Sequence, residues 1–425
     1  MAIHSSLSRG CSGLLPSDCW LDFVVEDDVL HNWPISLLVQ DKTMNQAADL
    51  DELSLFRDMA RRAFEQEITP HYEQWEADKM VPRALWHRLG DAGLLGPDVE
   101  EQYGGAGASP HVTLAMIEEL SAMGFGGFAS GYGIHNNIVA PYLSRHGTEE
   151  QKAHWLPRMV TGEVVGALAM TEPGAGSDVQ SIRTHAARDG DEWVLNGSKI
   201  FITNGIHADL VIVAAITDPG KGAKGTSLFL VDAHAPGFEK SRKIDKIGQH
   251  TSDTALLFFN DVRLPAEALL GDENSGFIIM MNELPRERLG IAAQAIAASE
   301  GALDITVQYV QEREAFGQKI GQFQNTRFKL ADVKTEITLN RAFYEQCARQ
   351  YAEGRLSADT AAMLKLASCE MQCRVADQCL QLFGGYGYTA EYPISRFYVD
   401  ARIQTIYGGS SEIMRELVAR SILGR

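Results

Sequence analysis

The chain has 425 residues, of which 45% are apolar and 22% are charged, a composition typical of a globular protein with room for two or three domains. Its 38 basic and 56 acidic residues give a net charge of −18, which excludes duplex nucleic acid as a partner because phosphates require a concentrated basic surface. The longest apolar run covers residues 210–216, well short of the roughly 18 residues that a membrane span needs. We therefore expect no nucleic acid partner and no membrane span.

The six cysteines are spread too widely for a metal or redox centre. They stand at positions 11, 19, 347, 369, 373 and 379. The pair 369 and 373 has helical i, i+4 spacing, but no histidine lies near it. We predict small core residues in a reducing compartment, the cytoplasm, and no metal site.

Residues 1–43 differ from the rest of the chain. Their acidic residues argue against a transit peptide, which avoids such residues, and the stretch lacks the apolar core of a secretory signal. Two interpretations stay open: an over-called start, with Met44 as the true first residue, or a poorly ordered extension. The acidic residues are Asp18, Asp22, Glu26, Asp27 and Asp28.

Hydrophobic periodicity divides the remaining sequence into three zones. Residues 44–162 show helical spacing, with helices expected at 82–92, 111–123 and 149–160. Residues 163–273 favour short strands, and "LNGSK" (195–199) is interpreted as a hairpin turn between two of them. Residues 274–425 are helical again, with Ala-rich stretches at 290–305 and 358–383. The predicted fold is multi-domain α+β: an N-terminal helical domain, a middle antiparallel β-domain and a C-terminal domain like a four-helix bundle.

One glycine-rich segment has the character of a ligand-binding loop. In "ALAMTEPGAGSDVQSIRT" (167–184), Gly174 and Gly176 leave backbone exposed, and Thr171 and Ser177 place hydroxyls on either side of the turn. Such a loop can hold a planar ring or a pyrophosphate, although the segment taken alone favours a plain hairpin connection. In "KIFITNG" (199–205), the strand period puts Phe201 and Thr203 on one face.

Five motifs resemble those of the acyl-CoA dehydrogenase family and occur in that family's order. The resemblance covers the chain from about residue 49 to the C-terminus. The family's architecture is the helical, β, helical division described above. The motifs are "AMTEPGAGSD", "KIFITNG", "EREAFGQKI" with "FQNTRFKLAD", "QLFGGYGY" and "IYGGSSEIMRELVAR".

The resemblance implies a tightly bound FAD and a homotetramer built as a pair of dimers. One group of residues is expected around the isoalloxazine: Met170, Thr171, Ser177, Phe201 and Thr203. A second group is expected at the adenine-diphosphate half of an FAD bound mainly by a neighbouring subunit: Arg313, Phe316, Gln324, Gln381, Gly384 and Gly385. Ser410, Ser411 and Glu412 are expected to line the flavin site after the active-site turn. From pattern alone, Arg313 also fits a solvated helix-end arginine, and Gly384 an ordinary helix stop.

The family reaction removes an α-proton from an acyl-CoA thioester with a carboxylate while the β-hydrogen leaves as hydride to the flavin. Many members carry the glutamate in a Tyr-Glu-Gly turn, where this chain has Tyr407, Gly408 and Gly409. The long-chain and isovaleryl-CoA dehydrogenases instead place it on a helix of the C-terminal domain. "NELPRERLGIA" (282–292) resembles that helix, with Glu287 at the catalytic position.

Two alternatives to Glu287 as the base were considered. Pro285 suits the first position of a helix, which would make Glu287 an ordinary acid of the first turn. Glu283 is a rival carboxylate one turn earlier, but it precedes the proline and lacks the motif match. The resemblance gives substrate contacts to Ser177, Arg288, Gly408 and Gly409. The backbone N–H of Gly408 is expected to donate to the thioester carbonyl, beside an FAD ribityl hydroxyl.

The sequence thus predicts an FAD-dependent acyl-CoA dehydrogenase of fatty acid β-oxidation that acts on a long or branched acyl chain. Electrons would pass to an electron-transfer flavoprotein. The alternatives are an acyl-CoA oxidase or flavin monooxygenase on the same fold, and a catalytically silent protein that binds CoA or flavin.

Overall fold

The computed structural model describes residues 43–424, and for residues 43–52 it describes the backbone alone. The chain divides into two compact units, residues 1–51 and 52–425. Apart from the start of the first helix, every feature discussed below lies in the second unit. The N-terminal extension, together with Cys11 and Cys19, lies outside the described residues apart from residue 43. No helix within residues 43–424 is long and apolar enough to cross a membrane.

The first zone is helical, as its periodicity predicts. Its apolar faces, including Phe64, Trp86 and Phe128, meet in one buried cluster. The helices are α1 (Thr43–Glu67), α2 (Tyr72–Asp78), α3 (Ala84–Asp91), α4 (Pro110–Ala122), α5 (Gly126–Gly133), α6 (Ala140–His146) and α7 (Glu149–Val160).

The segment Ile134–Val139, between α5 and α6, is π-helical, a wider turn that is common at functional sites. His135 is buried within it, and its Nδ1 accepts the backbone N–H of Gly166 at 3.1 Å. Burial lowers the pKa of His135 to about 4, so the ring is neutral and joins this segment to the first strand. Asn137, also buried, points toward the C-terminal zone.

The middle zone forms one eight-stranded sheet in the order β6-β7-β3-β2-β4-β5-β8, with β1 added beside β4. Most pairs are antiparallel, as predicted, but β1 and β2 each pair with β4 in parallel. The strands are β1 (Gly166–Ala169), β2 (His185–Asp189), β3 (Glu192–Thr203), β4 (Leu210–Ile216), β5 (Thr226–Asp232), β6 (Phe238–Lys243), β7 (Thr254–Pro265) and β8 (Leu269–Leu270).

The hairpin turn predicted at "LNGSK" is wrong, because these residues lie within the continuous strand β3. The glycine serves a bulge instead of a turn. The register with β7 shifts between Leu195 and Gly197, and Gly197 has a φ of 147°. A Cβ at Gly197 would lie 2.4 Å from Oγ1 of Thr184, so the glycine allows close approach of the segment that leads into β2.

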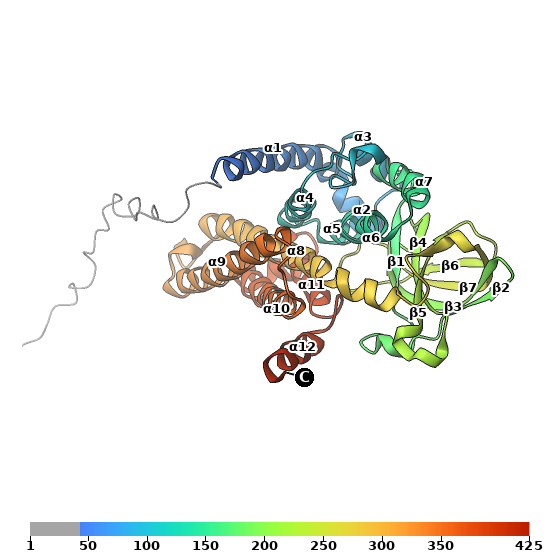
Figure 1. Cartoon of the computed structure of the whole chain (residues 1–425). Coiled ribbons are helices and arrows are strands. Elements are labelled where there is room, and N and C mark those ends of the chain that lie inside the picture. Colours follow the sequence, from blue (N-terminus) through green and yellow to red (C-terminus); the bar gives the residue numbers. More distant parts are fainter. Residues whose placement is uncertain (1–42, 425) are drawn as a thin grey trace, which may run out of the picture. The chain divides into compact units, whose positions relative to one another are not determined.

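The third zone is a helical bundle whose longest member is α8 (Figure 1). Helix α8 runs for 37 residues and packs against α4, α9, α10 and α11. It also contacts β5. The single helix α8 therefore packs against the sheet and against both helical zones. The elements are α8 (Gly276–Glu312), the hairpin β9 (Glu314–Ala315) and β10 (Gln318–Lys319), α9 (Gln324–Ala352), α10 (Ala358–Phe383), α11 (Pro393–Gln404) and α12 (Ser411–Leu423).

A buried ion pair holds the loop between β1 and β2 against β3. Nζ of Lys199, which is 0% exposed, lies 2.8 Å from a carboxylate oxygen of Glu172. The same carboxylate accepts the backbone N–H groups of Arg183 and Thr184 at 2.7 and 3.0 Å. The loop at residues 170–184 is therefore fastened at both ends.

We expect Lys199→Met to destabilise the protein by about 3–5 kcal/mol, because it leaves the carboxylate of Glu172 buried without its counter-charge. Thermal and denaturant unfolding would measure the loss. Lys221→Met, which removes an exposed pair with Asp218, is the control and should have a much smaller effect. Equal midpoints for the two variants would contradict the interpretation.

Candidate active site

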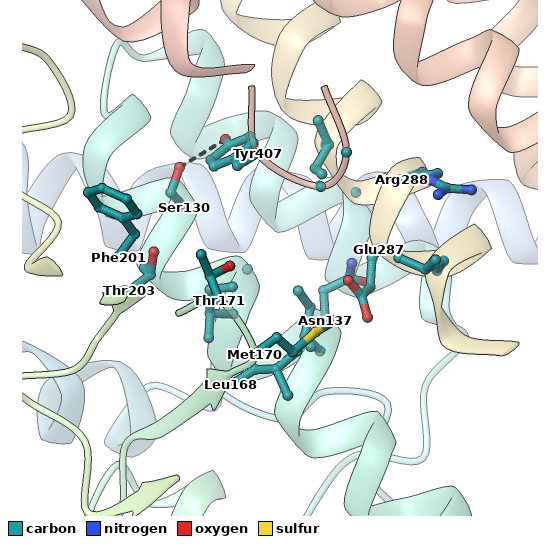
Figure 2. Close-up of a pocket in the computed structure, with 18 of the residues that line it drawn as sticks. Ser130, Asn137, Leu168, Met170, Thr171, Phe201, Thr203, Glu287, Arg288 and Tyr407 are labelled. Atoms are coloured by element: carbon teal, nitrogen blue, oxygen red, sulfur yellow. Dashed lines mark hydrogen bonds between the residues drawn. The ribbon is translucent and has the colours of Figure 1, made fainter. Parts of the chain in front are cut away.

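A cavity of about 460 Å³ opens where the three zones meet. Its wall comes from α4, α5, the π-helical segment, β1, the β1–β2 loop, β3, α8, the first residue of α10, the turn before α12 and the first turns of α12. Figure 2 shows Leu168, Met170 and Thr171 on one side and Glu287 on α8 across from them. The volume is that of an ordinary small-molecule site, and the wall combines apolar side chains with a few polar groups.

Glu287 is the carboxylate that reaches this cavity. Its side chain is 8% exposed and lines the wall, and the hydroxyl of Tyr142 donates to its Oε1 at 2.9 Å. Burial raises the pKa of Glu287 to about 7. The hydrogen bond from Tyr142 and the charge of Arg288 act in the opposite direction, whereas the negative charge of Glu283 adds to the increase.

The predicted helix start at Pro285 is wrong. Helix α8 begins at Gly276, and Pro285 lies inside it. A proline at this depth costs a backbone hydrogen bond, but the long apolar contact of α8 with its neighbours outweighs that loss. Glu287 therefore lies in the helix interior, and the charge of a helix N-terminus does not account for an acid at this position.

Glu283, the rival carboxylate, has a different environment. It is 3% exposed and does not belong to the cavity wall. Arg145 lies 2.7 Å from one of its oxygens and His146 lies 2.9 Å from the other. Both of its oxygens are thus engaged by neighbouring side chains.

The turn that precedes α12 presents backbone to the cavity. Gly408 has a φ of 62°, and a Cβ there would lie 2.3 Å from Cδ1 of Ile291. A side chain at this position would be strained by the positive φ and would have to displace the end of Ile291, so the turn favours glycine here. The N–H of Gly408 has no hydrogen-bond acceptor within residues 43–424, so it is available to a ligand.

A buried lysine holds the next residue of this turn. Lys365 on α10 is 0% exposed, and its Nζ donates to the carbonyl oxygen of Gly409 at 2.7 Å. Burial lowers the pKa of Lys365, and the nearby charge of Arg288 also disfavours its protonated form. On the other side of the turn, Tyr407 approaches Ser130 and Gln294 at 3.4 Å each. Gly408 thus lies between two residues, Tyr407 and Gly409, that are held by hydrogen bonds.

The residues expected around the isoalloxazine all line the cavity. Phe201 has a φ of 61° and is 62% exposed although it lies within β3. The register with β7 is irregular between Lys199 and Ile202, so this bulge turns the ring outward, and the prediction of a regular strand face needs that correction. The five residues are Met170, Thr171, Ser177, Phe201 and Thr203.

This wall fits the planar ring of FAD. The hydroxyls of Thr171, Ser177 and Thr203 form no side-chain hydrogen bond with any described residue, so they remain available for the polar edge of a ring. The ring of Phe201 offers a flat apolar face. Gly176 also lines the cavity, and a Cβ built on it meets nothing within 4 Å.

The second predicted group does not reach this cavity. Phe316 lies in the β9–β10 turn and is 96% exposed. The guanidinium of Arg313 lies 5.4 Å from the ring centre of Tyr386, next to the glycines that end α10. Gln324 begins α9 and Gln381 lies in the last turn of α10. These four residues lie at one end of the bundle, together with Gly384 and Gly385. None of the six lines the cavity.

The residues predicted at the start of α12 lie outside the cavity wall, whereas Arg288, next to Glu287, lies in it. Ser410 caps α12, and Ser411 and Glu412 begin it; none of the three lines the cavity. Arg288 does line it, and it is 4% exposed with no acceptor for its Nε among the described residues. Its remaining contact is a long hydrogen bond of 3.4 Å to the carbonyl of Ala358.

Sequence reasoning did not identify Tyr142, Lys365 or Asn137. Asn137 lines the cavity, and its amide bonds with the backbone and side chain of Arg286. Tyr142 and Lys365 lie inside helical patterns, where an aromatic residue or a lysine is common. The one sequence signal was a lysine at an otherwise apolar stretch of α10, "AAMLKLAS".

Comparison with known proteins gives matches over most of the chain. The models of the acyl-CoA dehydrogenase N-terminal, middle and C-terminal domains match residues 50–163, 167–262 and 274–423. The long-chain specific acyl-CoA dehydrogenase, mitochondrial, of Sus scrofa is 48% identical over 374 residues, which cover 88% of this chain and 86% of the relative. The isovaleryl-CoA dehydrogenase, mitochondrial, of Pongo abelii is 37% identical over 417 residues, which cover 98% and 93%.

Solved structures match equally well. An acyl-CoA dehydrogenase from Geobacillus kaustophilus has a TM-score of 0.84 at 44% identity and covers 87% of this chain and 98% of its own. A chain from the electron transferring flavoprotein structure of Acidaminococcus fermentans has a TM-score of 0.85 at 39% identity, with coverage of 88% and 98%. A glutaryl-CoA dehydrogenase from Mycobacterium smegmatis in complex with FADH2 has a TM-score of 0.83 at 31% identity, with coverage of 90% and 97%.

Lys365→Met should leave thermal stability equal or raise it, because a buried cation without a carboxylate partner gains from apolar replacement. It should also loosen the turn, so we expect faster amide exchange in a peptide covering residues 405–412 by hydrogen-exchange mass spectrometry. The exposed Lys334→Met on α9 is the control. Unchanged exchange at residues 405–412 would show that Lys365 does not hold the turn.

Proposed function

The chain belongs to the acyl-CoA dehydrogenase family, and on that basis we propose that it is an FAD-dependent enzyme that converts a long- or branched-chain acyl-CoA into the trans-2-enoyl-CoA. One observation carries the proposal. Glu287 is a buried carboxylate at the wall of a cavity whose opposite side presents Thr171, Thr203 and Phe201. Base and flavin wall thus face each other across the space for a substrate.

The base must be desolvated and more basic than an exposed glutamate, and the environment of Glu287 supplies both properties. The α-carbon of a thioester is a weak acid, so the carboxylate must be desolvated to become a stronger base. Glu287 has a pKa raised to about 7 by burial, which keeps it ionised above neutral pH and more basic than an exposed glutamate. When bound, FAD supplies the acceptor for the β-hydrogen, which leaves as hydride.

The thioester carbonyl must be polarised as the α-proton leaves, because negative charge develops on its oxygen. We assign this to the backbone N–H of Gly408, which has no acceptor within the described chain and lies at the cavity wall. Lys365 fastens the same turn through Gly409. A donor held in this way needs little reorganisation when charge appears.

The cofactor contacts divide into two groups within the proposal. Met170, Thr171, Ser177, Phe201 and Thr203 would hold the ring in the same chain. The exposed group at the end of the bundle would reach an FAD in a neighbouring subunit, which supports a homotetramer. Its members are Arg313, Phe316, Gln324, Gln381, Gly384 and Gly385. For Ser410, Ser411 and Glu412, a position at the flavin site stays a prediction.

The acceptor and the compartment complete the proposal. An electron-transfer flavoprotein as acceptor is supported by the similarity to a chain from the Acidaminococcus fermentans electron transferring flavoprotein structure. Cys347, Cys369, Cys373 and Cys379 are free, as in a reducing compartment. The names of the relatives from Sus scrofa and Pongo abelii include the word mitochondrial. A cytoplasmic location for this chain therefore stays a prediction.

Glu287→Gln should keep normal FAD content and slow flavin reduction by acyl-CoA by about 10²–10⁴-fold or more, since it removes the base. Anaerobic stopped-flow absorbance of the flavin measures this rate. Glu283→Gln is the matched control on the same helix face and should retain most of the rate. Full reduction by Glu287→Gln with an inactive Glu283→Gln would reverse the assignment.

Gly133 offers a test of chain length. Ile117 on α4 lines the cavity, and a Cβ on Gly133 would lie 3.7 Å from its Cδ1, an ordinary contact. Gly133→Leu should therefore be tolerated by the fold while it fills space that an acyl tail would use. At about 0.8 kcal/mol per buried methylene, the loss of three methylenes corresponds to roughly 50-fold in kcat/KM for long acyl chains.

Short acyl chains should be affected little by this change, and Gly133→Ala should give an intermediate profile. Flavin reduction across an acyl-CoA series measures the preference. A uniform loss for all chain lengths would show that Gly133 does not border the acyl tail.

A further inference from the structure

Tyr142 on α6 lies behind the base. It is 1% exposed, among the largest fully buried side chains, and it does not line the cavity. Its hydroxyl donates to Oε1 of Glu287 at 2.9 Å. The phenol therefore contacts the carboxylate from the side away from the substrate space.

The two oxygens of Glu287 are thereby distinguished. Oε1 is engaged by Tyr142, whereas Oε2 has no hydrogen-bond partner within residues 43–424. Oε2 is not buried against packed protein. It borders the cavity. A carboxylate held at one oxygen cannot turn freely about its terminal bond, so the same oxygen faces the cavity.

Charged groups on α8, α6 and α10 lie around Glu287. On α8, Glu283 raises its pKa and Arg288 lowers it. On α6, Arg145 forms an ion pair with Glu283 at 2.7 Å, and Nε2 of His146 lies 2.9 Å from the other oxygen of Glu283. Arg145 also donates to the hydroxyl of Tyr351 on α9. On α10, burial lowers the pKa of Lys365, and the charge of Arg288 lowers it further. Among all these groups, Tyr142 is the one whose side chain donates directly to the base.

We propose that Tyr142 is a positioning residue for proton abstraction, whose hydroxyl holds Oε1 of Glu287 so that Oε2 faces the substrate α-carbon and the carboxylate stays ionised. This rests on the proposed function. Tyr142 lies outside the motif that contains Glu287, and it does not line the cavity. Its chemistry is that of a buried donor, which favours the charged form of its acceptor.

A definite pH signature follows. Burial favours the protonated acid, and the hydrogen bond from Tyr142 opposes it. Loss of that bond raises the pKa of the base, so a higher pH is needed to ionise Glu287. A hydrogen bond to a charged group is worth about one to two pH units. The acid limb of the rate profile should move upward by that amount.

The experiment uses the FAD-loaded enzyme and anaerobic single-turnover reduction by a saturating long-chain acyl-CoA between about pH 5.5 and 9.5. We expect Tyr142→Phe to move the acid limb up by about one to two pH units and to lower the plateau rate about tenfold, with little change in the substrate concentration for half-saturation. The plateau falls because the carboxylate is no longer held in one orientation. A merely structural tyrosine would not move the limb.

Tyr132→Phe is the matched control. Tyr132 is 0% exposed and donates to the carbonyl of Leu94, so its loss removes an equally buried hydroxyl without touching Glu287. Its acid limb should coincide with that of the unmodified enzyme. Glu283→Gln should move the limb downward, because a like charge one turn away is removed.

A fluorinated tyrosine at position 142 keeps the test valid if Tyr142→Phe does not fold. Ring fluorination makes the phenol a stronger donor at nearly the same size, so the acid limb should move to lower pH. A limb that is unchanged in both variants, or that moves the opposite way, would overturn the proposal. If the Glu287→Gln enzyme reduces its flavin normally, the base assignment fails instead, and that result is independent of the profile of Tyr142→Phe.

Discussion

The close approach of α8 to α4 and the π-helical segment is the constraint on which the site depends. A Cβ on Gly301 would lie 2.0 Å from the carbonyl oxygen of Ala122, and one on Gly290 would lie 2.4 Å from Nδ2 of Asn137. Only hydrogen fits at either place, so the helices come near enough to bury Glu287, about one turn before Gly290. Larger residues would separate the helices and admit water to Glu287, the proposed base.

Three consecutive charged residues on α8 illustrate how a helix divides its contacts. Because successive residues are about 100° apart, Arg286, Glu287 and Arg288 point in different directions. Arg286 forms a buried ion pair with Asp98 at 2.5 Å, Glu287 borders the cavity, and Arg288 turns toward the start of α10. One pair supports the helix, and the carboxylate remains without a direct counter-ion. Because no cation pairs directly with Glu287, its carboxylate remains able to accept a proton.

Much of the fold followed from local patterns, and the exceptions have physical causes. The order of helical and strand zones was predicted because each element carries its own period of apolar residues. The helix start at Pro285 was wrong because the contacts of α8 outweigh the cost of an internal proline. The turn at Gly197 was wrong because the glycine allows close approach to Thr184 within a strand. In both cases tertiary packing overrode a residue's local preference.

The sequence by itself determined the element order and the family motifs, and it predicted Glu287 as the base in place of a residue at Gly408. These rest on neighbouring residues, whose spacing is visible in the chain. Only the tertiary structure decided which groups surround Glu287, the proposed base. Tyr142 and Glu287 are 145 residues apart, and Lys365 and Gly409 are 44 apart. Such contacts depend on how helices cross, and residues in the middle of a helix carry no local signal of what they will meet.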